Sequence, residues 1–404
     1  MNIEAHTTPT AIPCPACTGC SACEQACPAG CISMEYDTEG FLYPHINPET
    51  CLHCKLCERV CPVLHAEDKP KELHADSSAW GMIAQNHELF IQSGSGGAFS
   101  LMAKKVLEEG GVVIGAAWNS NWEVEHTVAY TWQEYCRIAG TKYVQSRLGN
   151  NLKLTAKLLK EKRTVLFGGT GCQITGLLSY LRNKHPNLIT VNIACYGSPS
   201  PLVWKKYLAD LAAHRGLGEI EEINFRRKDD RNALNLLVKG NKGSYQTFVY
   251  ADPFAWGMVH DIINRPCCED CLFKGAASNS DITIGDAWGL ERFDTSVQAG
   301  KGVSLAIAHT PRGLALIHSL QSDCRYFREL PLPAAISTNK GIIPSHNSHK
   351  SRRSKFFTGF SQGASPYTLL QRQQNAFSYR CSIFVQKCIW KAIHLIKKAL
   401  RIKV

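Results

Sequence analysis

The sequence predicts an α+β protein with three parts: a small cysteine-rich module, a larger mixed α/β domain and a basic helical tail. Ten of the 19 cysteines lie within the first 61 residues. Strand-like and helix-like patterns then alternate along the middle of the chain, which favours an α/β layer with some parallel strands. Twelve Lys or Arg residues and no Asp or Glu lie from residue 346 to the end. The net charge of +11 therefore belongs to the tail, and the rest of the chain is close to neutral.

Eight of the N-terminal cysteines form the motif Cys-x2-Cys-x2-Cys-x3-Cys-Pro twice, with an offset of 34 residues. Bacterial two-cluster ferredoxins have this spacing, and in them the fourth cysteine of each copy binds the other cluster. We therefore predict a ferredoxin-type domain over residues 14–66 with two 4Fe–4S clusters. Cluster one is assigned to Cys17, Cys20, Cys23 and Cys61. Cluster two is assigned to Cys51, Cys54, Cys57 and Cys27.

Two other uses of these cysteines fit the sequence less well. Zinc ribbons space their ligands in separated pairs rather than in a triplet followed by Cys-Pro. Disulfides require an oxidising compartment, and the first residues lack the pattern of a secretory signal. Pro28 sets the frame of the first motif, so Cys14 and Cys31, which flank it, are expected not to be ligands. We expect a cytoplasmic protein without a membrane span, because no apolar run is long enough to form one.

The rest of the chain divides by composition. Residues 1–13 are expected to be disordered and residues 67–78 to form a linker, and the α/β body has an N-terminal part, 79–160, and a C-terminal part, 161–345. Apolar periodicity predicts strands at 80–84, 112–118, 164–167 and 188–194, and helices at 98–109, 152–162, 173–182 and 201–214. Polar–apolar strands follow over 220–250. The tail covers 346–404, and its first basic run, Lys350–Lys355, is expected to be a solvated linker.

The segment Ser93-Gly94-Ser95-Gly96-Gly97 lies between a predicted strand and a predicted helix. Small residues there allow backbone N–H groups to converge on an anion at the positive end of the helix, which suits a dinucleotide pyrophosphate such as that of FAD. The alternative is a flexible turn. Phe99 breaks the Gly-x-Gly-x-x-Gly register, so a conventional NAD(P)-binding half is not supported.

Four further cysteines, Cys172, Cys195, Cys268 and Cys271, are scattered through the body. Two of them follow predicted strands, whose ends converge at one edge of a sheet. They could bind a third 4Fe–4S cluster, or they could pack as small apolar side chains. The spacing leaves both interpretations open, and the neighbouring Cys267 leaves the choice of ligand open as well.

Asp281 and Asp286 flank an apolar strand. Asp286, at the strand end, could orient a substrate or the ribityl group of a flavin, although aspartates also occur at such positions because they form turns. Tyr196 or Asp286 could supply a proton only if the fold brings it next to a flavin.

Apolar and basic residues near the end of the chain share a helical spacing. This predicts a basic amphipathic helix that docks on a membrane surface, at the inner face of the membrane, or on a protein partner. The alternative is an ordinary terminal helix that packs on the domain.

Several segments, in this order, resemble the beta-subunit family of coenzyme F420 hydrogenases and dehydrogenases, over about Gly81 to Gly289. They are Ser93–Ala98, Lys142-Tyr-Val-Gln-Ser146, Leu166–Gln173, Cys195–Ser200, Arg265–Phe273 and Ser280–Gly289. Members of that family bind FAD and iron–sulfur clusters and pass electrons between the clusters and a two-electron acceptor. The resemblance implies an FAD site on Ser93, Gly94, Ser95, Gly96, Gly97, Lys142 and Asp286. It also supports the third cluster, on Cys172, Cys195, Cys268 and Cys271.

The chain departs from the family at three positions near the expected cofactor. It has Thr170-Gly-Cys172 for Thr-Pro-Cys, Cys195-Tyr-Gly197 for Cys-His-Gly, and Asp286-Ala-Trp288 for Asp-Phe-Trp. The acceptor can therefore differ, and coenzyme F420 itself is not implied. Similar standalone proteins accompany cell-surface polysaccharide genes, which suggests a sugar-related substrate.

These observations favour a two-cluster ferredoxin module fused to a mixed α/β flavin-binding domain with a basic C-terminal helical tail. The expected function is that of an iron–sulfur flavoprotein oxidoreductase. It would take electrons from a donor such as a ferredoxin or a reductase and pass them through FAD to an organic two-electron acceptor. The alternatives are a non-catalytic electron-relay subunit that docks on a separate catalytic partner and a regulatory redox sensor. The near-neutral body gives no reason to expect nucleic-acid binding.

Overall fold

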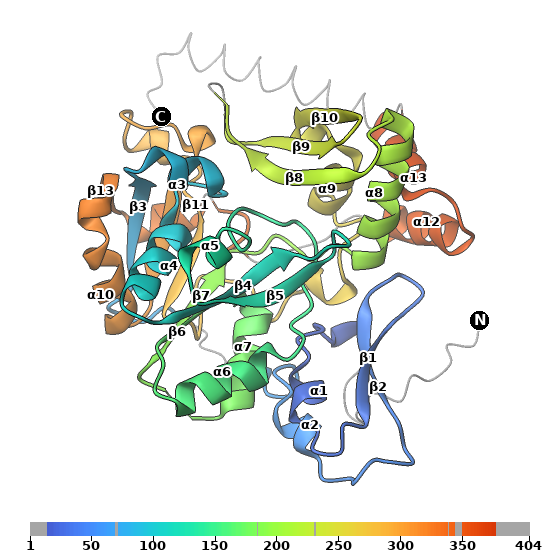
Figure 1. Ribbon diagram of the computed structural model, residues 1–404, viewed down its shortest axis with the longest axis horizontal. Coiled ribbons are helices and arrows are strands. Elements are labelled where there is room, and N and C mark those ends of the chain that lie inside the picture. The colour runs from blue at the N-terminus through green and yellow to red at the C-terminus, as the bar shows by residue number, and fades with distance from the viewer. Residues whose placement is uncertain are drawn as a thin grey trace, which may run out of the picture.

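The computed structural model describes residues 14–68, 72–183, 185–229, 232–337, 339–343 and 350–376 (Figure 1). The segment 1–13 and the expected amphipathic helix near the C-terminus lie outside these residues. Within the described residues, no helix has both the length and the apolar composition that crossing a membrane requires. The cysteine-rich module lies against one side of a mixed α/β body (Figure 1).

The two cysteine motifs of the N-terminal module have similar backbone conformations. It contains helix α1 (Ala22–Ala26), the antiparallel hairpin β1 (Ile32–Tyr36) and β2 (Leu42–Ile46), and helix α2 (Leu56–Arg59). The residues before the two helices, Ser21 and Lys55, are 34 positions apart, and both have a left-handed backbone with φ of 57° and 58°. The two cysteine loops therefore turn in the same way, as the doubled motif predicts.

The body is built on an eight-stranded mixed sheet in the order β13-β3-β12-β11-β7-β6-β4-β5. Its four parallel strands are β4 (Val112–Trp118), β6 (Val165–Thr170), β7 (Leu188–Ile193) and β11 (Ile282–Asp286). Antiparallel neighbours extend the sheet on both sides, namely β5 (Val124–Ala129), β12 (Ser304–Ala308), β3 (Ser78–Ala84) and β13 (Cys324–Leu330). The prediction of a mixed rather than a doubly wound body is confirmed.

Helices cover both faces of this sheet, because the central strands are apolar on both faces. Val113 of β4 and Leu166 of β6 face helix α4 (Ala98–Glu108) in one core. Their neighbours Val112 and Phe167 belong to a second core with helices α6 (Asn151–Lys160) and α7 (Gly171–Leu181). This alternation follows from the two-residue period of a strand. The shorter helices α3 (His87–Gln92), α5 (Trp132–Tyr135), α10 (Pro311–Ser319) and α11 (Leu332–Ser337) complete the cover.

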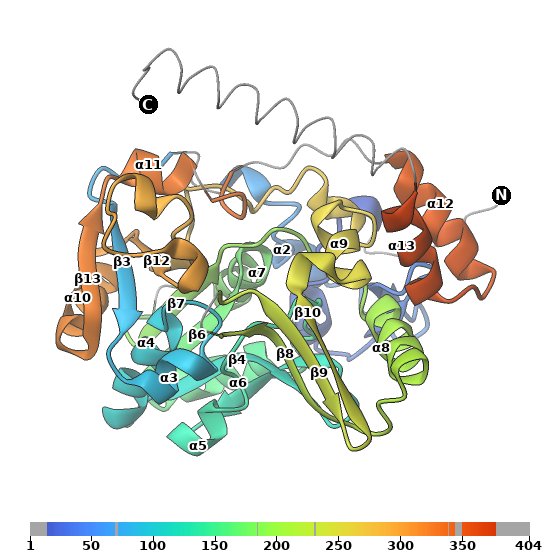
Figure 2. The same ribbon diagram turned by 90° about the horizontal axis from the view of Figure 1, so that it is seen from above.

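A second layer carries a three-stranded antiparallel sheet, in the order β10-β9-β8, and four helices. The strands are β8 (Ile220–Arg227), β9 (Asn235–Gly240) and β10 (Gly243–Phe248), and the helices are α8 (Pro201–Arg215), α9 (Pro253–Val259), α12 (Lys350–Ser361) and α13 (Pro366–Asn375). Figure 2 shows α8, α12 and α13 gathered at one end of the molecule. Buried aromatic side chains join these elements, among them Trp204, Tyr207, Phe225 and Phe254.

The expectation of a solvated linker over Lys350–Lys355 is wrong, because these residues form the first turns of α12. Phe356, Phe357 and Phe360 are buried in the aromatic core and fix the helix on the body. The basic residues that precede them therefore lie on an ordered helix, and Arg353 pairs with Glu39 of the N-terminal module.

Candidate redox site

The four cysteines predicted for cluster one lie together. Cys17, Cys20, Cys23 and Cys61 are buried and line one small cavity. Burial raises the pKa of the Cys20 thiol to about 12, and the nearby Cys17 and Cys61 act in the same direction. Cys61 comes from the second motif copy, so the exchange of the fourth cysteine that the spacing predicts is present in the geometry.

The cysteines predicted for cluster two are less deeply buried, and Cys54 is exposed. Cys27 and Cys51 pack on Cys31, and the Sγ atoms of Cys27 and Cys31 are 3.3 Å apart. Burial, followed by the contacts with Cys27 and Cys51, raises the pKa of Cys31 to about 12. Sequence reasoning left Cys31 outside the site because Pro28 sets the frame of the motif, but the structure brings it into the same group.

The four scattered cysteines of the body also come together. Cys172 lies in the first turn of α7, and Cys195 follows β7. Cys268 ends the short 3-10 helix Pro266–Cys268, and Cys271 lies in the loop after it. Burial raises the pKa of Cys172 well above its ordinary value, and the nearby Cys271, Cys195 and Cys268 add to the effect. The Cys267 side chain forms a hydrogen bond with that of Cys268, so it lies beside this group as well.

Within the described residues, no group of three or more Cys, His, Asp or Glu side chains converges as the ligands of a single metal ion do. In a 4Fe–4S cluster each thiolate binds a different iron, so the sulfurs surround a cube instead of meeting at one atom. The three groups are consistent with that second arrangement, and each supplies the thiol donors that such a cluster needs.

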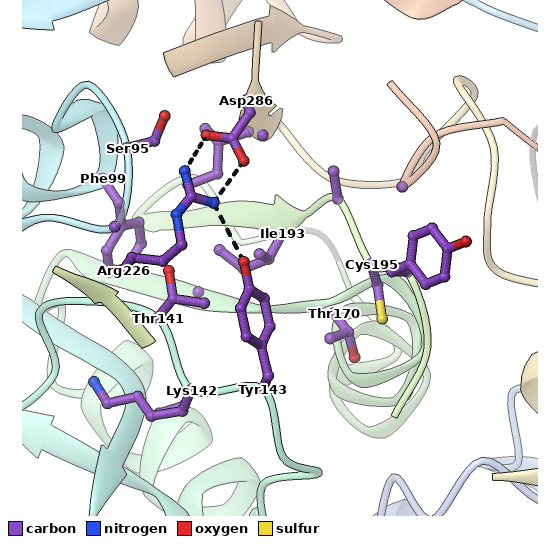
Figure 3. A pocket seen from close by; sticks show the side chains of 18 of the residues that line it. Ser95, Phe99, Thr141, Lys142, Tyr143, Thr170, Ile193, Cys195, Arg226 and Asp286 are labelled. Atoms are coloured by element: carbon purple, nitrogen blue, oxygen red, sulfur yellow. Dashed lines mark hydrogen bonds and ion pairs between the residues drawn. The ribbon is translucent and has the colours of Figure 1, made fainter. Parts of the chain in front are cut away.

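A cavity of about 690 Å³ opens where the parallel strands end (Figure 3). Its walls include the carboxyl ends of β4, β6, β7 and β11 and the start of α4. Ligands of open α/β sheets usually bind at this edge. Cys195 lines the same cavity, so the cavity and the four-cysteine group share a wall.

The glycine loop forms one end of the cavity. Ser93, Gly94, Ser95 and Gly97 line it, whereas Gly96 packs beneath the loop. A Cβ atom on Gly96 would lie 2.0 Å from the carbonyl oxygen of Met82, so only glycine fits there. The buried Lys228 Nζ donates to the carbonyl oxygens of Phe90 and Ser93 and holds the start of the loop.

Lys142, which the resemblance implies as a cofactor ligand, is already engaged with backbone carbonyls. Its Nζ donates to the carbonyl oxygens of Ile138 and Ala139 at 2.7 and 2.8 Å, in the turn that follows α5. Burial lowers its pKa to about 7. The side chain lines the cavity wall, but its ammonium points away from the Arg226–Asp286 pair (Figure 3).

Asp286 lies at the opposite end, where sequence reasoning missed its partner. Arg226 of β8 donates to both carboxylate oxygens of Asp286 at 2.9 Å, and to the Tyr143 hydroxyl at 3.2 Å (Figure 3). The Arg226 side chain is 4% exposed, so the pair is held in a fixed geometry. The basic run at residues 226–228 was the only feature of the sequence that pointed to this ion pair. The run does not indicate which carboxylate Arg226 binds.

His126 is a second residue that the sequence did not single out. It lines the cavity, its Nδ1 is 3.1 Å from the Ser146 hydroxyl, and its Nε2 is 3.0 Å from the carbonyl oxygen of Gly168. A carbonyl only accepts, so Nε2 carries the proton and Nδ1 accepts from Ser146. Burial lowers the pKa of His126 to about 4, so the ring is neutral at pH 7.

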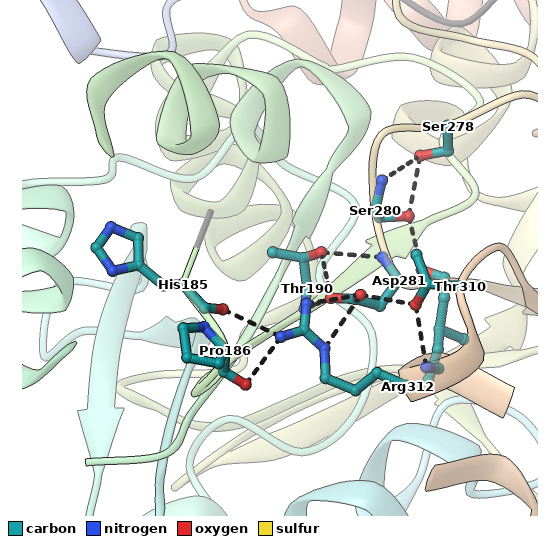
Figure 4. Close-up of polar contacts among 10 residues, drawn as sticks. His185, Pro186, Thr190, Ser278, Ser280, Asp281, Thr310 and Arg312 are labelled. Carbon is teal, nitrogen blue, oxygen red and sulfur yellow. Dashed lines mark hydrogen bonds and ion pairs between the residues drawn. The ribbon is translucent and has the colours of Figure 1, made fainter. Parts of the chain in front are cut away.

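Asp281, the other aspartate of the β11 segment, has a structural role away from the cavity (Figure 4). One carboxylate oxygen accepts from the backbone and hydroxyl of Thr190, and the other accepts from Thr310 and Arg312. Arg312 also donates to the carbonyl oxygens of His185 and Pro186. Asp281 therefore ties β7 and β11 to the start of α10.

Comparisons with known proteins agree with the two-part organisation. Residues 16–64 match the family model of the 4Fe–4S dicluster domain. Residues 162–328 match the family model for the C-terminal region of the coenzyme F420 hydrogenase/dehydrogenase beta subunit. No curated protein matches.

Among solved structures, the chain is similar to one from the F420-reducing [NiFe] hydrogenase complex of Methanosarcina barkeri. The two are 17% identical, with a TM-score of 0.45, over 74% of this chain and 94% of that chain. The two family matches follow one another along the sequence in the order that the resemblance predicts. The chain therefore carries a 4Fe–4S dicluster domain over residues 16–64, followed at residues 162–328 by a region that matches the C-terminal part of the coenzyme F420 hydrogenase/dehydrogenase beta subunit.

Proposed function

We propose that this iron–sulfur electron-transfer protein is a flavoprotein oxidoreductase that binds FAD in the 690 Å³ cavity. The observation that carries the proposal is the wall shared by the cavity and the four-cysteine group, through Cys195. A third 4Fe–4S cluster on Cys172, Cys195, Cys268 and Cys271 would then lie next to the flavin. Bound FAD would accept single electrons from the clusters and deliver two to an organic acceptor.

The residues present suit that cofactor. The amides of the glycine loop and the first turn of α4 supply donors and a positive helix end for the pyrophosphate. Gly96 allows the loop to lie close to β3, because a Cβ atom there would meet the Met82 carbonyl oxygen. Lys142 would act by shaping the loop after α5, since its ammonium is occupied by carbonyls.

The other end of the cavity would hold the acceptor and supply a proton. The Tyr196 hydroxyl donates to the carbonyl oxygen of Val259, and both carboxylate oxygens of Asp286 accept from Arg226, so neither side chain is placed to donate into the cavity in this geometry. The Tyr143 oxygen accepts from Arg226, which leaves its hydrogen free to point at a cavity occupant. We assign the proton donor to Tyr143.

The test is anaerobic purification of the full chain with measurement of iron, acid-labile sulfide and flavin. We expect about twelve irons, corresponding to three clusters, and one FAD per chain. A Cys172→Ala variant is expected to lose about four irons, whereas Cys324→Ala, which changes a cysteine outside all three groups, is expected to keep them. A protein with about eight irons would contradict the third cluster, and a protein without flavin would contradict the FAD site.

The electron-relay role remains the second candidate, because the matched family model describes a beta subunit of larger enzymes. It predicts cluster absorbance without flavin and no turnover until a partner protein is added. If flavin is bound, reduced clusters should reduce an added acceptor directly. Coenzyme F420 and sugar derivatives of cell-surface polysaccharide metabolism are the two acceptor classes to compare.

A further inference from the structure

Arg265 connects the N-terminal module to the redox site of the body. It is 1% exposed and is among the largest fully buried side chains of the described chain. Its backbone N–H donates to the carbonyl of Ser198, which lines the cavity, and it precedes the loop that contains Cys268 and Cys271. Its guanidinium extends in the other direction, into the N-terminal module.

The guanidinium is held by neutral acceptors around the first cysteine loop. Nε donates to the carbonyl oxygen of Cys17 at 2.7 Å, and Nη2 donates to that of Leu42 at 3.0 Å. Nη1 donates to Oε1 of Gln145 at 3.2 Å, and Nε2 of Gln145 donates to the carbonyl oxygen of Thr18 at 3.0 Å. One arginine and one glutamine thus fasten the loop between the first two cluster-one cysteines to the body.

The packing around these contacts is close. Gly19 has φ of 70°, and a Cβ there would lie 2.9 Å from Nη1 of Arg265 and 2.8 Å from Nε2 of Gln145. On its other side the guanidinium stacks over the Tyr43 ring, with 4.0 Å between Cζ and the ring centroid. The site therefore fits a planar guanidinium, which an ammonium cannot replace contact for contact.

Among the residues that the structure describes, no carboxylate forms a direct ion pair with Arg265, although Asp37 is near enough to interact with its charge. A buried charge without a counter-charge is costly, so a nearby anion is expected. The thiols near its guanidinium are Cys17, of the cluster-one set, and Cys267 and Cys268 of the body. Four thiolates on a 4Fe–4S core carry a net negative charge that grows on reduction, and nearby charge shifts the reduction potential of such a cluster.

We propose that Arg265 is a positioning residue that fastens the cluster-one loop to the body and raises the reduction potential of cluster one through its buried charge. A transferred electron would then reside preferentially on cluster one, which faces the body, rather than on cluster two. This inference rests on the dicluster domain and not on the presence of flavin.

The test is a redox titration of the reconstituted full chain, followed by low-temperature EPR, without added flavin. Arg265→Met is expected to make one cluster at least tenfold harder to reduce, a shift of about 59 mV for one electron. Arg265→Lys keeps the charge and is expected to shift the potential less. Arg353→Met is the matched control, because Arg353 also joins the module to the body but pairs with Glu39.

An unchanged potential in Arg265→Met, or an equal shift in Arg353→Met, would overturn the proposal. If Arg265→Met fails to assemble, Gln145→Glu and Gln145→Leu test the same charge. Both variants remove hydrogen bonds of Gln145, but only the glutamate would also neutralise the guanidinium. The glutamate is therefore expected to lower the potential further than the leucine, and equal potentials would refute the inference. A chain that binds no cluster one would refute it together with the dicluster assignment, whereas a flavin-free chain would refute only the FAD proposal.

Discussion

The two halves of the N-terminal module differ in how they are held. The cluster-one half shares the apolar cores of the body: Cys17, Phe41 and Tyr43 belong to one, and Cys20 and Val60 to another. The cluster-two half has only a small core, formed by Cys31 and Ile32 with Cys23 of the cluster-one set, on which Cys27, Cys51 and Cys57 pack. Units with so little apolar core generally need a metal or a covalent link to fold.

This difference indicates which interactions stabilise each half. We infer that the cluster-one half is stabilised by both its metal centre and the body, whereas the cluster-two half depends mainly on its metal centre. The body has large cores on both faces of its sheet, so we expect it to fold without either cluster.

The largest expected effect is the loss of cluster two. Replacing Cys51 by Ala should remove about four irons and abolish hydrogen-exchange protection in β1 and β2 near Cys31, because little apolar core remains there. The equivalent Cys17→Ala variant should also lose four irons but keep protection around Phe41 and Tyr43, since the body still packs on them. Equal loss of protection in both variants would contradict the comparison.

A smaller effect concerns the body alone. His126 has a pKa of about 4 in the folded protein, against 6.5 for an ordinary histidine. Between pH 6.5 and 4 the His126 ring is therefore protonated in the unfolded chain but not in the folded protein. The free energy of unfolding falls by about 3 kcal/mol as the pH is lowered through this range. Denaturant unfolding from pH 7 to 4.5 should show a smaller loss in His126→Gln than in the wild type.

The control for this experiment is the exposed His87, since His87→Gln should unfold like the wild type at every pH. Asp252, whose pKa burial raises to about 6, has the opposite pH dependence. It is unchanged in all three proteins and cancels in the comparison. A His126→Gln curve parallel to that of the wild type would contradict the assignment.

The smallest expected effect is at the contact between the module and the body. Glu39 accepts from Arg353 of α12 in a pair that is 23% and 12% exposed. Glu39→Gln keeps the size but removes the charge, and should weaken this contact by about 1–2 kcal/mol. Limited proteolysis should then release the module faster, whereas Glu35→Gln, on an exposed position of β1, should not change the rate.

The local sequence was sufficient to predict the type of fold and the exchange between the two motif copies, but it left Cys31 outside the second cysteine group and the third group open. The doubled motif indicated the exchange of Cys27 and Cys61, because loop spacing alone sets which thiols can surround one cube. Strand-end positions allowed Cys172 and Cys195 to meet, but left their packing as small apolar side chains equally open. The domain boundaries and the metal and flavin roles of individual residues stay predictions.

Contacts between distant elements were beyond the sequence. The pairing of Arg226 with Asp286 depends on how β8 lies over the end of β11. The hydrogen bonds of the Lys142 ammonium depend on the turn after α5, which supplies the carbonyl acceptors. The charge of the basic run before Phe356 favours a solvated segment, but the three phenylalanines that follow it decide that it is helical.

The sequence by itself determined that this chain carries two iron–sulfur clusters and a mixed α/β body, since thiol spacing and apolar periodicity are local properties. Only the tertiary structure decided that a cavity shares a wall with four distant cysteines and that Arg265 reaches the cluster-one loop. These contacts join residues as many as 248 positions apart. No local pattern encodes them, because the packing of whole layers selects which partners a buried side chain finds.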